Sequence, residues 1–270
     1  MIRFPNCKIN IGLNIVSKRS DGYHDIESIF IPVNWCDVLE IIPASDSIPR
    51  LFLSGIELDG ETEDNLCFKA FRLLEKSVHI PPVHIHLLKN IPSGAGLGGG
   101  SSDGAFTLLM LDELFGLGIG TAELKNIALQ LGSDCPFFID NIPALATGRG
   151  DILSPITISL RGLHIVIIKP PVHVSTALAY SKVVLGKTFA SLASAITKPI
   201  PEWRNNIVND FESPVFAAHP ILASIKEDLY RQGALYASMS GSGSAVYGIF
   251  KEKPGPEIGF PGCTSWQAPL

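Results

Sequence analysis

The sequence predicts an α+β fold in two lobes that meet near residue 150. Stretches in which every second residue is apolar, typical of strands, are mixed with stretches of helical spacing. Because they do not follow the strict strand–helix alternation of a doubly wound sheet, an α+β arrangement is favoured. The length of 270 residues, 46% of them hydrophobic, is enough for two modest domains, expected at residues 1–150 and 151–270.

The first half of the chain is expected to hold strands and helices separated by short polar turns. Residues 8–16 (KINIGLNIV) place Ile9, Ile11 and Leu13 on one face, as a strand does. A polar turn centred on Asp21 and Gly22 follows. The predicted strands cover residues 8–16, 26–33, 38–42, 51–53 and 83–87. The predicted helices cover residues 65–77, 105–115 and 121–131, the last with Thr121 as its N-cap.

The second half shows the same mixture of patterns. Residues 164–169 predict a strand, and the predicted helices cover residues 175–184, a stretch near 207–211, and 220–233. The segment ALYASMSGSGSAVYGIF predicts a strand, a glycine turn and a second strand. A last short strand is expected in the tail after Lys253.

The charge pattern argues against two classes of protein. There are 21 Lys and Arg against 26 Asp and Glu, a net charge of −5, with no basic stripe of the kind that nucleic-acid binders carry. No run of about 18 apolar residues is present to span a bilayer. We therefore expect neither a nucleic acid nor a membrane as a partner.

The cysteines indicate the compartment. They are widely spaced and form no C-x-x-C pair, unlike a disulfide framework or a zinc signature. The five are Cys7, Cys36, Cys67, Cys135 and Cys263. We expect reduced thiols packed as small apolar residues. A signal peptide's apolar stretch is interrupted by Lys8, Asn10 and Asn14, so a cytoplasmic location is expected.

A glycine-rich loop is the most informative feature of the sequence. Between Gly94 and Gly100 five of seven residues are glycine, and Ser101 and Ser102 follow directly. Glycine clusters cost backbone entropy, so they persist where nothing larger fits, and a plain tight turn needs only one or two. A predicted helix leaves the loop, and bare N–H groups at a helix N-terminus bind phosphate. The two hydroxyls can contact phosphate oxygens or a bridging Mg²⁺.

Two well-known phosphate loops fit poorly. A Walker A loop is excluded because Gly100 occupies its lysine position. The string Gly94-x-Gly96-x-x-Gly99 does match the dinucleotide fingerprint, with Glu113 19 residues after Gly94. That motif needs a second strand ending at the acidic residue. Glu113 instead lies inside a predicted helix that another helix follows, so a dinucleotide-binding loop is disfavoured.

Three blocks occur along the chain in a recognisable order. KINIGLNIVSKRSDGYHDIES contains Asp-Gly-Tyr-His, IPSGAGLGGGSSDGA is followed by GSDCPFF, and SMSGSGSAVYGIF carries a second glycine motif. Together they resemble the GHMP small-molecule kinases, and more narrowly the 4-diphosphocytidyl-2-C-methyl-D-erythritol kinases of non-mevalonate isoprenoid synthesis. Gly104 is a small departure, since alanine is usual there, and it puts nothing catalytic in doubt.

The resemblance implies a two-lobed GHMP kinase fold with the active site in the cleft between the lobes. The N-terminal, ATP-binding lobe would be like domain 2 of ribosomal protein S5, and the C-terminal lobe would be a ferredoxin-like α/β lobe. ATP and Mg²⁺ are the implied cofactors. The implied nucleotide-binding residues are Pro92, Ser93, Gly94, Ala95, Gly96, Leu97, Gly98, Gly99, Gly100, Ser101 and Ser102, with Asn65 and Lys69 near adenine.

The resemblance also assigns the catalytic pair. Asp134 would be the base that takes the proton of the acceptor hydroxyl, and Lys8 would hold Asp134 ionised and polarise that hydroxyl. Spacing alone would not give these roles. Without the resemblance, Asp134 fits an exposed turn aspartate, and Lys8 fits a charge that marks the start of a strand.

The implied acceptor is a small molecule with a cytidine diphosphate head. Tyr23 suits stacking on cytosine, His24 suits hydrogen bonds to the base, and Asn10 lies one strand-face step from Lys8. Thr176 and Tyr180 lie four apart on a predicted helix, and the resemblance makes Tyr180 a second aromatic on cytosine, although ordinary packing also explains it. Gly241, Ser242 and Gly243 are expected to approach the phosphate loop, although a plain hairpin turn explains them as well.

Two other features are not interpreted as sites. His84 and His86 share a predicted strand face but lack a third ligand, so a solvated face is favoured over a metal, and no metal-ligating residue is predicted. Arg149 in Gly-Arg-Gly-Asp matches a three-residue adhesion signal that recurs by chance, and it is better explained as a surface charge.

The leading hypothesis is an ATP- and Mg²⁺-dependent kinase of 4-diphosphocytidyl-2-C-methyl-D-erythritol that acts as a monomer or weak homodimer. One alternative is a GHMP kinase of another small alcohol, which Asp-Gly-Tyr-His disfavours. Another is a catalytically silent GHMP-fold ligand-binding protein, which the presence of Lys8, Asp134, Ser101 and Ser102 disfavours.

Overall fold

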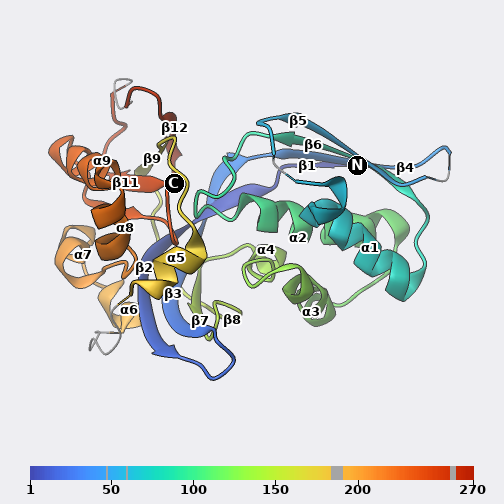
Figure 1. Cartoon of the computed structure of the whole chain (residues 1–270), viewed down its shortest axis with the longest axis horizontal. Helices are drawn as coiled ribbons and strands as arrows, with labels where there is room; N and C mark the ends of the chain where they lie inside the picture. The colour runs from blue at the N-terminus through green and yellow to red at the C-terminus, as the bar shows by residue number, and fades with distance from the viewer. Residues whose placement is uncertain (47, 59, 184–190, 256–259) are drawn as a thin grey trace. The chain divides into compact units, whose positions relative to one another are not determined.

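The computed structural model describes residues 1–46, 48–58, 60–183, 191–255 and 260–270 (Figure 1). It divides into two compact units, neither of which is one continuous stretch of chain. Unit 1 comprises Met1–Cys7, Trp35–Ser93 and Gly98–Ile142. Unit 2 comprises Lys8–Asn34, Gly94–Leu97 and Pro143–Leu270. The glycine-rich loop is therefore shared, because its first residues belong to unit 2 and its last to unit 1.

Unit 1 is a sheet covered on one face by helices (Figure 1). Its four described strands lie in the order β1-β4-β6-β5, and only β5 and β6 run parallel. The strands are β1 (Ile2–Arg3), β4 (Val38–Pro43), β5 (Arg50–Gly55) and β6 (Val83–Lys89). The helices are η1 (Thr62–Asp64), α1 (Leu66–Val78), α2 (Gly99–Phe115), α3 (Thr121–Leu131) and α4 (Phe137–Asp140). Apolar residues of β4, β6, α1, α2 and α3 share one core.

Unit 2 contains two described four-stranded sheets, ordered β2-β3-β7-β8 and β10-β11-β9-β12. The first consists of β2 (Asn6–Lys18), β3 (His24–Cys36), β7 (Ala144–Thr147) and β8 (Ile152–Pro155), and the first two residues of β2 and the last two of β3 are assigned to unit 1. The second consists of β9 (His164–Lys169), β10 (Tyr236–Met239), β11 (Val246–Phe250) and β12 (Thr264–Pro269). The helices are α5 (Thr176–Ser181), α6 (Leu192–Ala195), α7 (Ile200–Asn206), α8 (Glu212–Ala218) and α9 (Pro220–Arg231). None of the described helices is both long enough and apolar enough to cross a membrane.

The predicted strands are confirmed, including the last short one, but several helix boundaries are wrong. The helix expected from Ala105 begins six residues earlier, at Gly99, because packing holds a glycine run that has little helix propensity of its own. Thr121 is the first residue of α3 and not its N-cap, which is Gly120.

The helix expected near residues 207–211 is absent. That stretch connects α7 to α8, and Asn209 forms a β-bridge with Leu13 of β2. The Leu13 N–H and oxygen bond to the backbone of Val208 and Asp210, so these two residues pair with a neighbouring strand and do not continue a helix. The predicted helix at 175–184 is described as α5 only up to Ser181, and residue 184 lies outside the described residues.

Candidate active site

The first half of the glycine-rich loop, Gly94–Leu97, packs within unit 2. Gly94 and Gly96 have φ of 60° and 76°, in the left-handed region that favours glycine. A Cβ on Gly96 would lie 2.0 Å from the backbone oxygen of Ser240. Gly96 therefore cannot be replaced without moving the chain that it touches.

The second half of the loop forms the N-terminus of α2 in unit 1. Gly98 caps the helix with φ of 68°, and the first intrahelical bond runs from the Ser102 N–H to the Gly98 oxygen at 2.9 Å. The N–H groups of residues 99–101 therefore have no acceptor inside the helix. Together with the positive end of the helix dipole, they form a site suited to a phosphate group. Ser101 is half-buried and Ser102 is buried.

A small cavity of about 70 Å³ lies beside this helix start in unit 1. Its lining residues are Leu58, Asn65, Leu66, Lys89, Ser93, Gly100 and Asp103. Three predicted nucleotide residues, Asn65, Ser93 and Gly100, are thus brought together. Asn65 also caps α1 by accepting the Cys67 N–H at 2.9 Å. Lys69 is placed differently, since it forms an exposed ion pair with Asp64 at 2.9 Å.

Two residues of this cavity that the sequence analysis missed belong to a buried charge cluster. The Lys89 ammonium donates to a carboxylate oxygen of Asp37 and, at 2.6 Å, to one of Asp103. Asp37 also accepts the N–H groups of Asn90 and Ile91 at 2.6 and 2.8 Å. The cluster thus ties the end of β6 to the N-terminal part of α2.

Burial and charge act against each other in this cluster. Burial raises the pKa of Asp103 well above its usual value, with the Lys89 ammonium opposing that effect. Burial lowers the pKa of Lys89, but the two carboxylates outweigh it and the net direction is upward. A sequence signal for Lys89 existed, because Val83, Ile85, Leu87 and Lys89 share the buried face of β6.

Lys8 and Asn10 lie side by side on the buried polar face of β2 in unit 2. Lys8 is 3% exposed, and its ammonium group donates to the Asn10 side-chain oxygen at 2.6 Å and lies 4.8 Å from the centre of the Phe30 ring. The Asn10 amide donates to the Ser28 hydroxyl at 2.8 Å. The Lys8 backbone N–H donates to the Leu97 oxygen at 2.9 Å, so this strand also holds the glycine-rich loop.

The turn at Ser240–Gly243 packs against the same part of the glycine-rich loop. The Ser240 hydroxyl donates to the Gly96 oxygen at 2.8 Å, and the Ala245 N–H donates to the Ala95 oxygen at 3.0 Å. The backbones of Gly241 and Gly243 both lie against Gly96. The predicted approach of the second glycine motif to the phosphate loop is confirmed for these two glycines.

Of the three predicted acceptor-binding residues that carry rings, two form one aromatic group in unit 2 and one does not. The rings of His24 and Tyr180 stack at 4.8 Å with 19° between their planes, and Tyr180 meets Phe211 edge-on at 4.8 Å. Tyr23 is the exception, since it is 55% exposed and lies under the Arg149 guanidinium, 4.9 Å away. Thr176 hydrogen-bonds through its hydroxyl to Ser242 at 2.9 Å.

Asp134 lies in unit 1, half-buried in the turn that leads into α4, where its backbone oxygen accepts the Phe137 N–H at 3.3 Å. The next residue, Cys135, is fully buried, and burial raises the pKa of its thiol to about 12. Because Lys8 belongs to unit 2, its pairing with Asp134 stays a prediction.

Known proteins share this fold and these sequence blocks. The family profile "GHMP kinases N terminal domain" matches residues 65–149, and "GHMP kinases C terminal" matches residues 192–258. The fold resembles that of Methanococcus jannaschii mevalonate kinase, with a TM-score of 0.74 at 13% identity over 99% of this chain and 97% of that one. The chain belongs to the GHMP kinases.

Closer relatives narrow the assignment. The 4-diphosphocytidyl-2-C-methyl-D-erythritol kinase of Porphyromonas gingivalis is 50% identical over 99% of both chains, and that of Bacteroides thetaiotaomicron is 52% identical over 93% of this chain and 92% of that one. A crystal structure of 4-(cytidine 5'-diphospho)-2C-methyl-D-erythritol kinase matches with a TM-score of 0.81 at 30% identity, covering 99% of this chain and 98% of that one. Within the GHMP kinases, the chain is a member of the 4-diphosphocytidyl-2-C-methyl-D-erythritol kinase family.

Proposed function

We propose that this chain transfers the γ-phosphoryl group of ATP to the 2-hydroxyl of 4-diphosphocytidyl-2-C-methyl-D-erythritol. The products would be the 2-phosphate and ADP, in the non-mevalonate pathway to isoprenoid precursors. One observation carries this proposal: two relatives named as kinases of this alcohol are 50% and 52% identical to the chain, over 99% and 93% of its length. The glycine-rich loop at the start of α2 supports it, because phosphoryl transfer depends on positioning and charge neutralisation.

Each group in the proposed site has a chemical role. The free N–H groups at the start of α2 bind the phosphates of ATP, and the cavity beside Asn65 and Ser93 adjoins them. Asp134 takes the proton of the 2-hydroxyl as its oxygen attacks phosphorus, and ADP leaves with the electrons of the broken bond. Lys8 polarises the same hydroxyl, and Asn10 fixes the Lys8 ammonium at 2.6 Å.

Mg²⁺ fits the oxygen donors beside this phosphate site. Ser101 and Ser102 supply hydroxyls in the first turn of α2, and the buried Ser102 hydroxyl has no hydrogen-bond partner among the described residues. Mg²⁺ prefers a few protein oxygens together with substrate phosphates and water. When bound, the ion would neutralise charge on the phosphates.

The acceptor end of the site is proposed to lie at the aromatic group of unit 2. His24 and Tyr180 already stack on each other, so both rings are held in orientations suited to a flat base. We propose that cytosine contacts these two rings, with Tyr23 beside them and Thr176 near the diphosphate. The Arg149 guanidinium over Tyr23 adds a cation at that edge.

The remaining proposals concern context. The matched segments at 65–149 and 192–258 support residues 1–150 as the ATP-binding domain and 151–270 as the C-terminal domain in sequence terms, with Lys8–Asn34 packed in the same compact unit as the second. All five cysteines are free thiols, which supports a reducing compartment such as the cytoplasm. We propose a small-molecule substrate, no nucleic-acid or membrane partner, and a monomer or weak homodimer.

An assay of ADP release with three alcohols tests the function. With ATP and Mg²⁺ we expect turnover of 4-diphosphocytidyl-2-C-methyl-D-erythritol and none of mevalonate or homoserine. Turnover of homoserine alone would refute the proposal. Nucleotide binding without turnover of any alcohol would favour a silent ligand-binding protein.

A further inference from the structure

The irregular segment between α7 and α8 is bound to β2 of unit 2. The Leu13 N–H donates to the Val208 oxygen at 2.9 Å, and the Asp210 N–H donates to the Leu13 oxygen at 2.8 Å. The Asp210 carboxylate accepts the Ile15 N–H at 2.8 Å. Both the backbone and a side chain of the segment are therefore bonded to β2. These bonds fix the positions of Asn209, within the segment, and of Glu212, directly after it.

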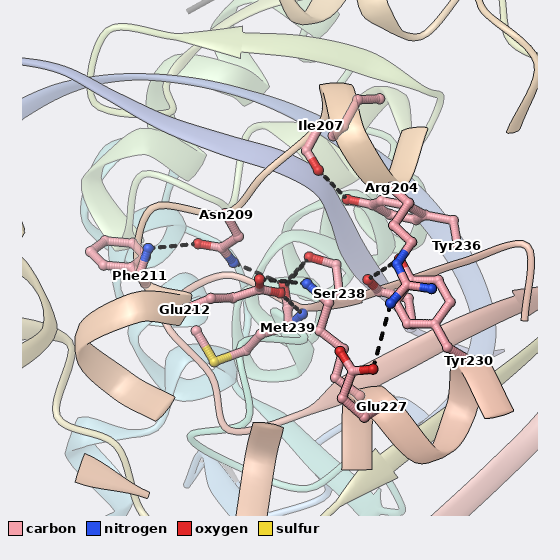
Figure 2. Close-up of polar contacts among 12 residues, drawn as sticks. Arg204, Ile207, Asn209, Phe211, Glu212, Glu227, Tyr230, Tyr236, Ser238 and Met239 are labelled. Carbon is pink, nitrogen blue, oxygen red and sulfur yellow. Dashed lines mark hydrogen bonds and ion pairs between the residues drawn. The ribbon is translucent and has the colours of Figure 1, made fainter. Parts of the chain in front are cut away.

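Asn209 forms hydrogen bonds through both the oxygen and the nitrogen of its side-chain amide (Figure 2). It is 3% exposed, and its oxygen accepts the Phe211 N–H at 3.0 Å. Its nitrogen donates to the backbone oxygens of Met239 and Gly241, each at 2.8 Å. One buried amide thus holds the carbonyl group of Met239, just before the Ser240–Gly243 turn, and that of Gly241, within it.

Glu212, three residues later, holds the strand that leads into this turn (Figure 2). One carboxylate oxygen accepts the Met239 N–H at 2.9 Å and the Ser238 hydroxyl at 3.0 Å. The other accepts the Lys226 ammonium at 2.6 Å. Both backbone groups of Met239 are therefore bonded: its oxygen accepts from Asn209, and its N–H donates to Glu212.

The turn that they hold is in direct contact with the glycine-rich loop. Ser240 reaches Gly96 through its hydroxyl at 2.8 Å, and its own backbone oxygen occupies the space of a Cβ on Gly96. Ser240 also bonds to Asn10, the partner of the Lys8 ammonium. This turn therefore contacts both the phosphate loop and the residue that holds the Lys8 ammonium.

We infer that Asn209 and Glu212 are positioning residues for phosphoryl transfer, which set the Ser240–Gly243 turn against residues 94–97. They touch neither ATP nor acceptor in this scheme and act through the turn. The inference rests on the proposed kinase function. Displacements of about 1 Å far from the reacting atoms can cost about 100-fold in rate, so the effect should be measurable.

The test compares variants that differ in one atom or group. Asn209→Asp keeps the acceptor for the Phe211 N–H but loses the donor to two carbonyls. We expect kcat/KM for ATP to fall about 100-fold, with a raised KM, and ADP binding measured by calorimetry to weaken. Glu212→Ala should show the same pattern, whereas Glu212→Gln, which keeps an acceptor for the Met239 N–H, should recover most of the loss.

Tyr230→Phe is the matched control. It removes a side-chain bond of 3.2 Å to the Ala237 oxygen on the same strand, two residues before Met239, and is expected to leave KM for ATP unchanged. A merely structural role would lower the melting temperature or the folded fraction without changing KM. Parent-like KM and ADP affinity in folded Asn209→Asp would overturn the inference.

Failure of the two proposals can be told apart. If the unsubstituted protein releases no ADP with the cytidyl alcohol, the proposed function fails, while the comparison of ADP affinities still decides the inference. If Asn209→Asp does not fold, the contrast between Glu212→Ala and Glu212→Gln decides it. Equal kinetics for those two variants would overturn it.

Discussion

At the residue scale, the environment of Lys8 explains why a lysine occurs in the buried part of β2. The ammonium group is buried, accepted by Asn10 and placed beside the face of Phe30. Burying a charge costs free energy unless it is compensated, so a buried lysine at this place has a purpose beyond solubility. A fixed cation suits the polarisation of a hydroxyl better than a mobile one, because it needs no reorganisation during reaction.

The proposed base gives the first prediction. Asp134→Asn keeps the size of the side chain but removes its ability to accept a proton, so kcat should fall by at least about 100-fold. Nucleotide binding should persist, because the phosphate site consists of backbone N–H groups at the start of α2. Steady-state kinetics and ADP calorimetry measure the two effects, and unchanged turnover would refute the assignment of Asp134.

The neighbouring thiol gives the second prediction. Burial raises the pKa of Cys135 to about 12, so at pH 8 only about one thiol in ten thousand is ionised, and thiolate is the form that alkylates. The thiolate fraction rises tenfold per pH unit but stays small up to pH 9. Between pH 8 and pH 9 we expect iodoacetamide not to label Cys135 in the folded protein. Mass spectrometry measures the labelling.

Unfolding in urea is the control for this labelling, because the exposed thiol regains an ordinary pKa and reacts. Rapid modification of Cys135 in the folded protein at pH 8 would show that the turn around Asp134 opens.

At the scale of elements, the charge cluster of Lys89, Asp37 and Asp103 joins β6 to α2 across the base of the phosphate loop. Removing the cation leaves two buried carboxylates without compensation, a change that costs about 3–5 kcal/mol when one partner of a buried pair is lost. Lys89→Met should therefore reduce the free energy of unfolding by about that amount. Urea denaturation monitored by circular dichroism measures it.

The exposed pair of Arg3 and Glu113 in the same unit is the matched control. Both side chains are about half exposed, and such pairs contribute between 0 and about 1 kcal/mol, so Arg3→Met should change the free energy of unfolding little. Equal losses in Lys89→Met and Arg3→Met would contradict a special contribution from the buried cluster.

Periodicity predicted the elements that have one clear apolar face. The alternation in β6 and the helical spacing in α1 correspond to elements with one buried side, whereas β2 is buried on both faces from Asn6 to Ile15. The start of α2 could not be predicted in this way, because glycine lacks both helix propensity and an apolar side chain. Resemblance, and not periodicity, supplied the role of that helix start.

The segment around Asn209 shows the opposite kind of failure. Its apolar residues have helical spacing, yet its backbone pairs with Leu13, almost two hundred residues earlier in the chain. Local sequence carries no signal for such a long-range contact. The same limit explains why the sequence analysis missed Asp37 and Asp103. Both bond to Lys89, and all three residues are far apart in the sequence.

At the scale of the whole molecule, unit 2 draws its core from both halves of the sequence. Leu13, Ile15 and Ile26 come from the first 34 residues, and they share a core with residues from 166 to 250 such as Val166 and Leu222. The Tyr247 hydroxyl also donates to the Asn10 oxygen at 2.8 Å. A domain boundary at residue 150 therefore separates parts of one compact unit.

This arrangement predicts that residues 151–270 do not fold alone. Loss of Leu13, Ile15 and Ile26 removes burial worth about 1.5–3 kcal/mol each, a sum comparable with the total stability of about 5–15 kcal/mol that domains have. The edge bonds from β2 to Asp210 and Val208 are lost as well. We expect the isolated fragment to show no cooperative transition in urea. Co-expression with residues 1–150 restores every one of these contacts, so the paired fragments should regain a cooperative transition. Cooperative unfolding of residues 151–270 alone would mean that β9, β10, β11 and β12 with their helices suffice, and that the β2 contacts add little.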